Sequence, residues 1–190
     1  MDITLSWDLF IIVMFVVIMS YSLIIGRDNT LKVILGTYVA ILAADALGSL
    51  FGKYFAGSAL FVKLLSLASV SNEAQAVIFA KVVIFVAMVI MLSVRGAFEI
   101  HTMDDRSSLV KLILTLMYSF MSAALIISAM LTFMSGVAFI GGGNPATTSV
   151  ALWWINKQSD AIKSIVENAP LFFALPGVSF LFHSIYSSKD

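Results

Sequence analysis

Residues 31–55 read LKVILGTYVAILAADALGSLFGKYF, and this stretch decides the class of fold. As an α-helix rising about 1.5 Å per residue it would be about 38 Å long, enough to cross a hydrocarbon layer of about 30 Å. Its central acid, Asp45, costs about 2.5 to 3.5 kcal/mol on insertion scales. Roughly ten large apolar side chains at about 0.5 kcal/mol each outweigh that cost. The stretch therefore predicts a helix that spans a membrane.

The composition of the whole chain agrees with a lipid environment. Among 190 residues, 61% are hydrophobic and 12% are charged, which leaves too little polar surface for a soluble globule. The 11 basic residues are matched by 11 acidic ones, which disfavours disordered and nucleic-acid-binding classes. The absence of cysteine excludes disulfides, thiolate nucleophiles and cysteine-ligated metals. We expect an all-α, polytopic membrane protein with membrane lipid, and no nucleic acid, among its partners.

Uncharged apolar stretches predict a four-helix transmembrane domain over residues 1–135. The predicted spans cover residues 9–25, 31–55, 76–94 and 109–135. A short polar turn at residues 27–30 separates the first two spans, and Asn29 or Thr30 is the expected N-cap of the second. No small-residue cleavage site follows the first stretch, so we expect it to be a retained helix and not a signal peptide.

The remaining residues, 136–190, have a less regular pattern. A glycine-rich loop is expected first, followed by an amphipathic interfacial helix at about residues 150–168. A short hydrophobic segment follows at about 169–186, and Pro170 and Pro176 are expected to break it. Such a segment can cross the membrane, re-enter from one face or pack against the bundle, and the sequence leaves these alternatives open.

Interfacial features are expected on the outer side of the membrane, where the amphipathic linkers between the predicted spans lie. A further amphipathic stretch runs from about residue 59 to 70. Trp153 and Trp154 have the amphipathic rings that lie at headgroup depth, and Lys53 and Lys81 are expected to extend their ends to the interface. We therefore interpret these two tryptophans and two lysines as interfacial anchors.

The distribution of basic residues sets the expected orientation. With four spans, one side receives five basic residues and the other receives four. The first set comprises Arg27, Lys32, Arg95, Arg106 and Lys111, and the second comprises Lys53, Lys63, Lys157 and Lys163. The N-terminus carries Asp2 and Asp8 but no basic residue, so we expect it to lie outside.

A ridge of small residues runs along the second predicted span. Its members recur at intervals of four, and they are Gly36, Ala40, Ala44, Gly48 and Gly52. In lipid, helices associate through close packing, and such a ridge lets two backbones approach. The neighbouring helix is either another span of the same chain or a span of another subunit, including a second copy of this chain.

Asp45 lies near the middle of the same span and is the clearest polar candidate. Its helical spacing from Gly48 and Gly52 indicates that it faces protein and not lipid. One interpretation is a protonatable site or part of a polar pathway. The other is a packing residue held by hydrogen bonds and protonated because desolvation disfavours the charged form.

Signals for catalysis, cofactors or metals are weak. His101 and His183 are the only histidines and lie far apart in the sequence, so they do not indicate a metal or haem pair. The stretch from Gly48 to Tyr54 lacks the spacing and the terminal Ser or Thr of a phosphate-binding loop. We therefore expect a protein that is not an enzyme, with no catalytic, cofactor or metal residues to assign.

The first 135 or so residues resemble the colicin V production protein (CvpA-like) family of small bacterial inner-membrane proteins. The similarity rests on Trp7-Asp8, on the run from Ser22 to Arg27, on the small-residue second span and on Asp105-Arg106-Ser107 before the fourth. Asp28 follows Arg27 where the family has glycine, and Ser119, Ser122, Ala123 and Ala124 replace repeated glycines. The resemblance implies an envelope protein of the inner membrane, linked to colicin export and membrane homeostasis.

Two functional hypotheses follow from the sequence. The first is a non-enzymatic subunit or scaffold of a bacterial envelope assembly, in contact with other membrane subunits or with copies of itself. The second is a small channel or proton-coupled transporter in which Asp45 lines a polar pathway.

Overall fold

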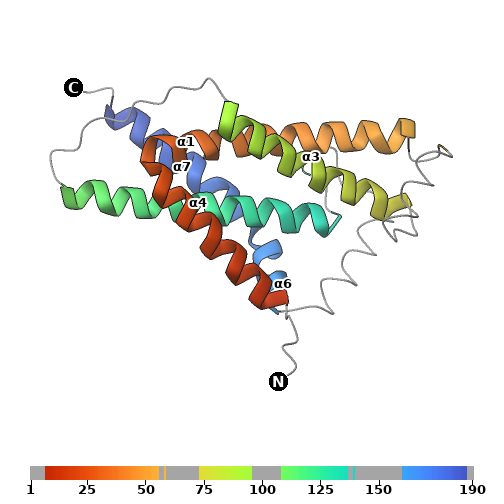
Figure 1. The fold of residues 1–190 in the computed structure, drawn as a ribbon, viewed down its shortest axis with the longest axis horizontal. Helices are drawn as coiled ribbons and strands as arrows, with labels where there is room; N and C mark the ends of the chain where they lie inside the picture. Colours follow the sequence, from red (N-terminus) through yellow and green to blue (C-terminus); the bar gives the residue numbers. More distant parts are fainter. Residues whose placement is uncertain are drawn as a thin grey trace.

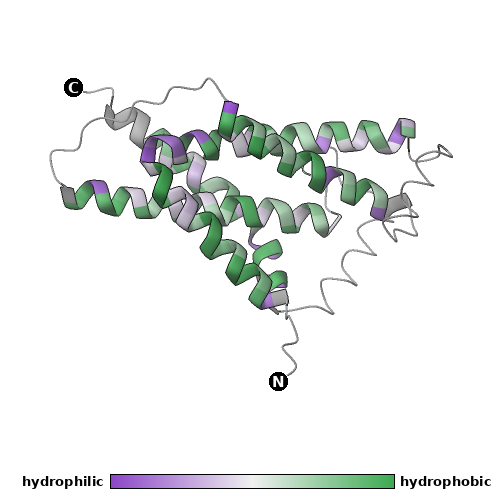
Figure 2. Ribbon diagram, viewed as in Figure 1, coloured by the Kyte–Doolittle hydropathy of each residue, from purple (hydrophilic) through white to green (hydrophobic). Residues whose placement is uncertain are grey.

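The computed structural model describes residues 7–55, 58, 73–95, 108–136, 139 and 160–187. All elements among these residues are helices, in the order α1 (Trp7–Phe55), α3 (Glu73–Arg95), α4 (Ser108–Met134), α6 (Asp160–Glu167) and α7 (Ala169–Ser187). Three of them, α1, α3 and α4, are long and apolar enough to cross a membrane. Figure 2 shows mostly hydrophobic helix shafts, with hydrophilic residues gathered at the bend of α1 and near helix ends. These features confirm that the described elements are all helical, and they are compatible with a helical membrane protein.

Helix α1 contains a sharp bend at Gly26. The backbone angles there are φ 81° and ψ 173°, a region open essentially only to glycine. The bend divides α1 into a first arm, residues 7–25, and a second arm, residues 27–55, which diverge from Gly26 as the two sides of a V (Figure 1). A single residue thus reverses the chain between the first two predicted spans.

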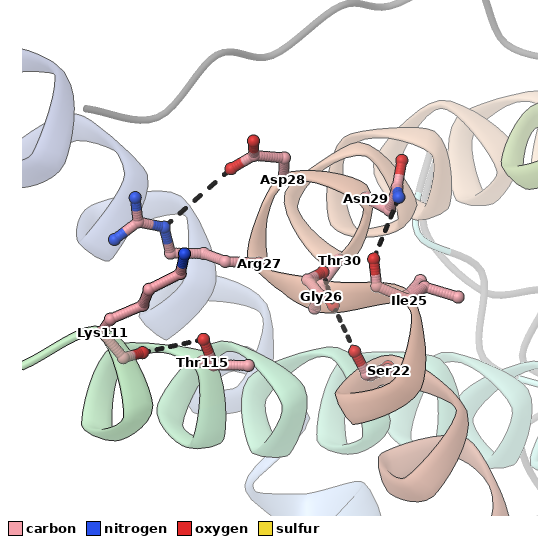
Figure 3. A network of polar contacts seen from close by, with 9 residues as sticks. All are labelled: Ser22, Ile25, Gly26, Arg27, Asp28, Asn29, Thr30, Lys111 and Thr115. Carbon is pink, nitrogen blue, oxygen red and sulfur yellow. Dashed lines mark hydrogen bonds and ion pairs between the residues drawn. The ribbon is translucent and has the colours of Figure 1, made fainter. Parts of the chain in front are cut away.

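The expected polar turn at residues 27–30 is wrong, because these residues are helical. Their side chains do not cap the second arm but donate to carbonyls at the end of the first (Figure 3). The Thr30 hydroxyl lies 2.9 Å from the carbonyl oxygen of Ser22 and 2.8 Å from that of Gly26. The Asn29 amide donates to the carbonyl of Ile25 at 3.0 Å. These bonds satisfy acceptors that the bend releases from the helical ladder.

Two hydrophobic clusters hold the helices together. The larger joins the second arm of α1 to α3 and α4, and its buried centre includes Ile34, Phe85, Tyr118 and Phe133. The smaller joins the first arm to the C-terminal end of α4 and to α6, through Ile11, Ile127, Leu131 and Ile162. Helix α4 is therefore the central helix of the bundle, since it contributes to both clusters.

The C-terminal elements differ from their predicted form. Of the expected interfacial helix at 150–168, the described part is α6, and its Ile162 is buried against the bundle and not directed to a membrane surface. Helix α7 runs without a break through Pro176, so the expected proline-broken segment is wrong. Pro170 is the second residue of α7, where a missing N–H removes no helical hydrogen bond.

Several predicted features lie outside the described residues. They are the amphipathic stretch at 59–70, the interfacial anchors Trp153 and Trp154, His101, and the glycine run at 141–143.

Candidate functional site

The small-residue ridge of α1 packs against α3 of the same chain. A Cβ atom added at Gly36 would lie 3.2 Å from Leu92 Cβ, and one added at Gly52 would lie 2.9 Å from Val77 Cγ2. Ala40 and Ala44, between them on the ridge, are fully buried. As residue numbers rise along the ridge, their partners' numbers fall along α3, so the second arm and α3 pair antiparallel, as Figure 1 shows. The ridge thus packs against another helix of the same chain, which is one of the two predicted alternatives.

Gly48 has a special place on this ridge because it lies under Lys81. A Cβ atom at Gly48 would overlap the Lys81 Cγ, and Cδ and Cε of the same lysine also lie against the position. The methylene stem of Lys81 therefore crosses α1 through the space that the missing side chain leaves.

The Lys81 stem ends at Asp45. The Lys81 Nζ donates to Asp45 Oδ1 at 2.5 Å, and the two side chains are 11% and 0% exposed. Lys81 lies about 12 Å along α3 from its start at Glu73, and Asp45 lies about 15 Å along α1 from its end at Phe55. These positions are near the middle of a hydrocarbon layer of about 30 Å. The site is a buried ion pair at mid-helix depth.

Lys81 is not an interfacial anchor in this structure, contrary to expectation. Its side chain points across the bundle to Asp45 because Gly48 opens the direct path. Pairing also removes the need for the ammonium to reach water, since each charge offsets the other's desolvation. The three-residue spacing of Asp45 and Gly48 in the sequence places both on one face of α1. Identifying Lys81 as the partner also requires the register of the antiparallel α3 against α1, which the sequence pattern alone did not give.

The other predicted polar residues are not part of this pair. Lys53 is exposed in the last turn of α1, with its Nζ 5.6 Å from the centroid of the Tyr54 ring. Among the described residues, no group of three or more His, Asp or Glu side chains could hold a metal ion. Within the interior of the described bundle, the oppositely charged side chains in contact are those of Asp45 and Lys81.

Sequence reasoning missed Tyr38, which fixes α7 to α1. Its hydroxyl donates to the carbonyl of Phe173, and it lies 3.5 Å from the position a Cβ would take at Gly177. Pro176 has no N–H to donate to the carbonyl of Phe172, and Tyr38 brings a donor from α1 to the neighbouring carbonyl, that of Phe173. A tyrosine in a span gives no periodic signal that would identify such a role.

Small hydroxyl side chains line the buried face of α4. Ser119, Ser122 and Ser128 are fully buried, and their Oγ atoms make no hydrogen bond within the described part of the chain. Their small volume allows close helix contact. They serve packing in this structure.

Comparison with protein families, with curated proteins and with solved structures finds no match.

Proposed function

We propose that this protein is a non-enzymatic integral membrane subunit or scaffold of a bacterial envelope assembly. In this proposal the two arms of α1, with α3 and α4, form four membrane crossings. The turn at Gly26 supports two crossings within α1, because a straight helix of 49 residues would be about 74 Å long, more than twice the hydrocarbon thickness.

The observation that carries the subunit proposal is the uneven burial of the long helices. Only 11% of the residues in the apolar windows of α1 and α3 are buried, against 44% in that of α4. The interior is filled by the ridge, the ion pair and the aromatic core, whereas the outer faces of α1 and α3 are large, apolar and not covered by the other described residues. Such faces suit contact with lipid and with other membrane subunits or copies of the chain.

The proposed location is the bacterial inner membrane with the N-terminus outside. The bend of α1, the C-terminal end of α3 and the N-terminal end of α4 lie towards one side of the molecule (Figure 1). Arg27, Lys32, Arg95 and Lys111 belong to these three places, whereas Lys53 and Lys163 belong to elements that end or lie away from it. The concentration of basic residues at one end supports assigning that end to the cytoplasm.

The CvpA-like resemblance supports the same proposal through its best-placed motif. The run from Ser22 to Arg27 forms the end of the first arm, the bend and the first residue of the second arm. In this proposal Gly26 forms the turn at the membrane face, and Arg27 begins the second arm beside it.

The ion pair favours a second candidate, a small channel or proton-coupled transporter. Ionisable groups at mid-membrane depth are rare and are often parts of proton relays or ion pathways. Protonation of Asp45 would remove its attraction for Lys81 and loosen α1 from α3, which gives a direct route from proton binding to a change in helix packing.

Mass measurement separates the two candidates. The complex is extracted from native membranes in mild detergent and weighed by native mass spectrometry. The subunit proposal predicts a particle heavier than the sum of one 20.6 kDa chain and its bound lipid. Proteoliposomes with Asp45→Asn are expected to leak protons no differently from wild type. A single-chain particle together with proton flux that Asp45→Asn abolishes would reject the subunit proposal in favour of the transporter.

A further inference from the structure

Helix α7 is apolar both on the face that packs against the bundle and on the face that does not. Between Ala169 and Ser187 the sequence contains no Asp, Glu, Lys or Arg. On the packed face, Phe173 and Phe180 adjoin the larger hydrophobic cluster. The other face carries large apolar side chains that are 43% to 61% exposed, and they are Leu171, Leu175, Val178 and Leu181. A helix that lies on a membrane surface has a charged or strongly polar face, and α7 has no charged face.

Helix α7 starts at the same end of the bundle as the first arm of α1. Ile162 of α6, seven residues before α7 begins, belongs to the same hydrophobic cluster as Ile11 of the first arm. Ile11 lies near the start of that arm, about 22 Å along it from the bend at Gly26. Both helices therefore begin at the end of the bundle that is opposite the bend.

From this end, α7 runs back towards the bend. The Tyr38 hydroxyl of the second arm donates to the carbonyl of Phe173, near the start of α7. Figure 1 shows α7 ending on the side of the molecule that holds the bend of α1 and the start of α4. Phe173 lies about 21 Å along α7 from its end at Ser187, and Tyr38 lies about 17 Å along the second arm from Arg27. Helix α7 is therefore long enough to reach the level of the bend.

Contacts with α4 give the same direction. Ile162 of α6 shares the smaller cluster with Leu131, near the C-terminal end of α4. Pro176 of α7 lines a small apolar cavity with Phe120 and Ala124, which come earlier in α4. Residue numbers thus rise along α6 and α7 as they fall along α4, so α7 and α4 pack antiparallel.

We propose that α7 is a fifth membrane crossing, which brings the chain to the face that holds the bend of α1. Its 19 residues match those of the first arm, residues 7–25, so each helix is about 28 Å long, close to a hydrocarbon layer of about 30 Å. Since the two helices begin at one end of the bundle and reach the same face, a membrane that the first arm crosses is also crossed by α7. The exposed apolar face of α7 then contacts acyl chains. This inference rests on the four crossings of the proposed function.

Labelling of single cysteines tests the inference in the full chain, which has no native cysteine. A membrane-impermeant maleimide is added to intact bacterial spheroplasts and, separately, to inverted membrane vesicles. Asn29→Cys marks the face of the bend and Lys163→Cys the face of α6, since both side chains are exposed. Ser187→Cys is expected to react from the same face as Asn29→Cys and from the face opposite to Lys163→Cys. Val178→Cys, at mid-helix on the exposed apolar face, is expected to react from neither.

The two reference sites separate a failure of this inference from a failure of the four proposed crossings. The fifth crossing alone is overturned when Asn29→Cys and Lys163→Cys react from opposite faces but Ser187→Cys reacts with Lys163→Cys, or from neither face. Reaction of Val178→Cys from either face would overturn it as well. Reaction of Asn29→Cys and Lys163→Cys from the same face would reject the four crossings, and the fifth with them.

Discussion

At the scale of single residues, the fold contains a buried charge pair, and either charge would be costly to bury in the membrane without the other. Asp45 and Lys81 are both buried, and the Gly48 position admits the lysine stem only because it has no Cβ. Removing one partner of a buried pair leaves an uncompensated charge, whereas removing both charges with similar volumes is often neutral. The three residues therefore act as one unit, and their energies should not add.

A double-mutant cycle tests this unit. Asp45→Asn and Lys81→Met are each expected to lower the free energy of unfolding by about 3 kcal/mol or more, and the double variant by less than the more severe of the two. Unfolding by a denaturing detergent in mixed micelles provides the measurement. Lys53→Met, which removes an exposed cation from the end of α1, is the control and is expected to change stability by less than about 1 kcal/mol. Losses that simply add would show that the two charges do not interact.

At the scale of elements, the bend at Gly26 decides how α1 is arranged. Helical residues lie directly on both sides of it, and Thr30 returns a hydrogen bond to the carbonyl groups of Ser22 and Gly26. The bend also places Arg27 at the end of the bundle. A side chain at residue 26 would strain this conformation even though nothing lies within 4 Å of the Cβ position.

Gly26→Ala is accordingly expected to destabilise the protein by about 1 to 3 kcal/mol. The lower thermal midpoint in detergent should be accompanied by changed labelling of a cysteine introduced at the exposed Asn29. Gly177→Ala is the control, since its Cβ would meet the Tyr38 hydroxyl at an ordinary 3.5 Å inside α7. That variant is expected to be neutral or slightly stabilising, because alanine is the better helix former. Equal effects of the two substitutions would contradict a special role for Gly26.

At the scale of the whole molecule, hydrophobic patterning predicted the long helices well. The expected spans at 76–94 and 109–135 correspond to α3 at 73–95 and α4 at 108–134. A turn between the first two spans was predicted, but its place and form were not, because polar residues before a new helix usually indicate a cap and only the φ of one glycine reveals that the turn is at Gly26. Local pattern likewise did not predict that α7 continues through Pro176, or that Tyr38 donates to the carbonyl of Phe173 beside it.

The site could be predicted only in part, for a physical reason. Helical spacing placed Asp45 on the side of the small residues, and burial agrees with that position. The partner lysine could not be identified, because the choice between lipid interface and bundle interior depends on the register of α3 against α1. That register follows from contacts such as Gly36 with Leu92, which no local pattern encodes.

The most direct test of this account is disulfide cross-linking between Gly36→Cys and Leu92→Cys in a chain that has no native cysteine. The Cβ separation of 3.2 Å is close to that of a disulfide, about 3.8 Å, so mild oxidation of membranes is expected to link α1 to α3 within one chain. The product should migrate as a monomer of altered mobility, and the matched pair Gly36→Cys with Ile90→Cys, whose second site faces outwards, should not react. A cross-linked dimer, or no reaction of the first pair, would contradict an intramolecular ridge.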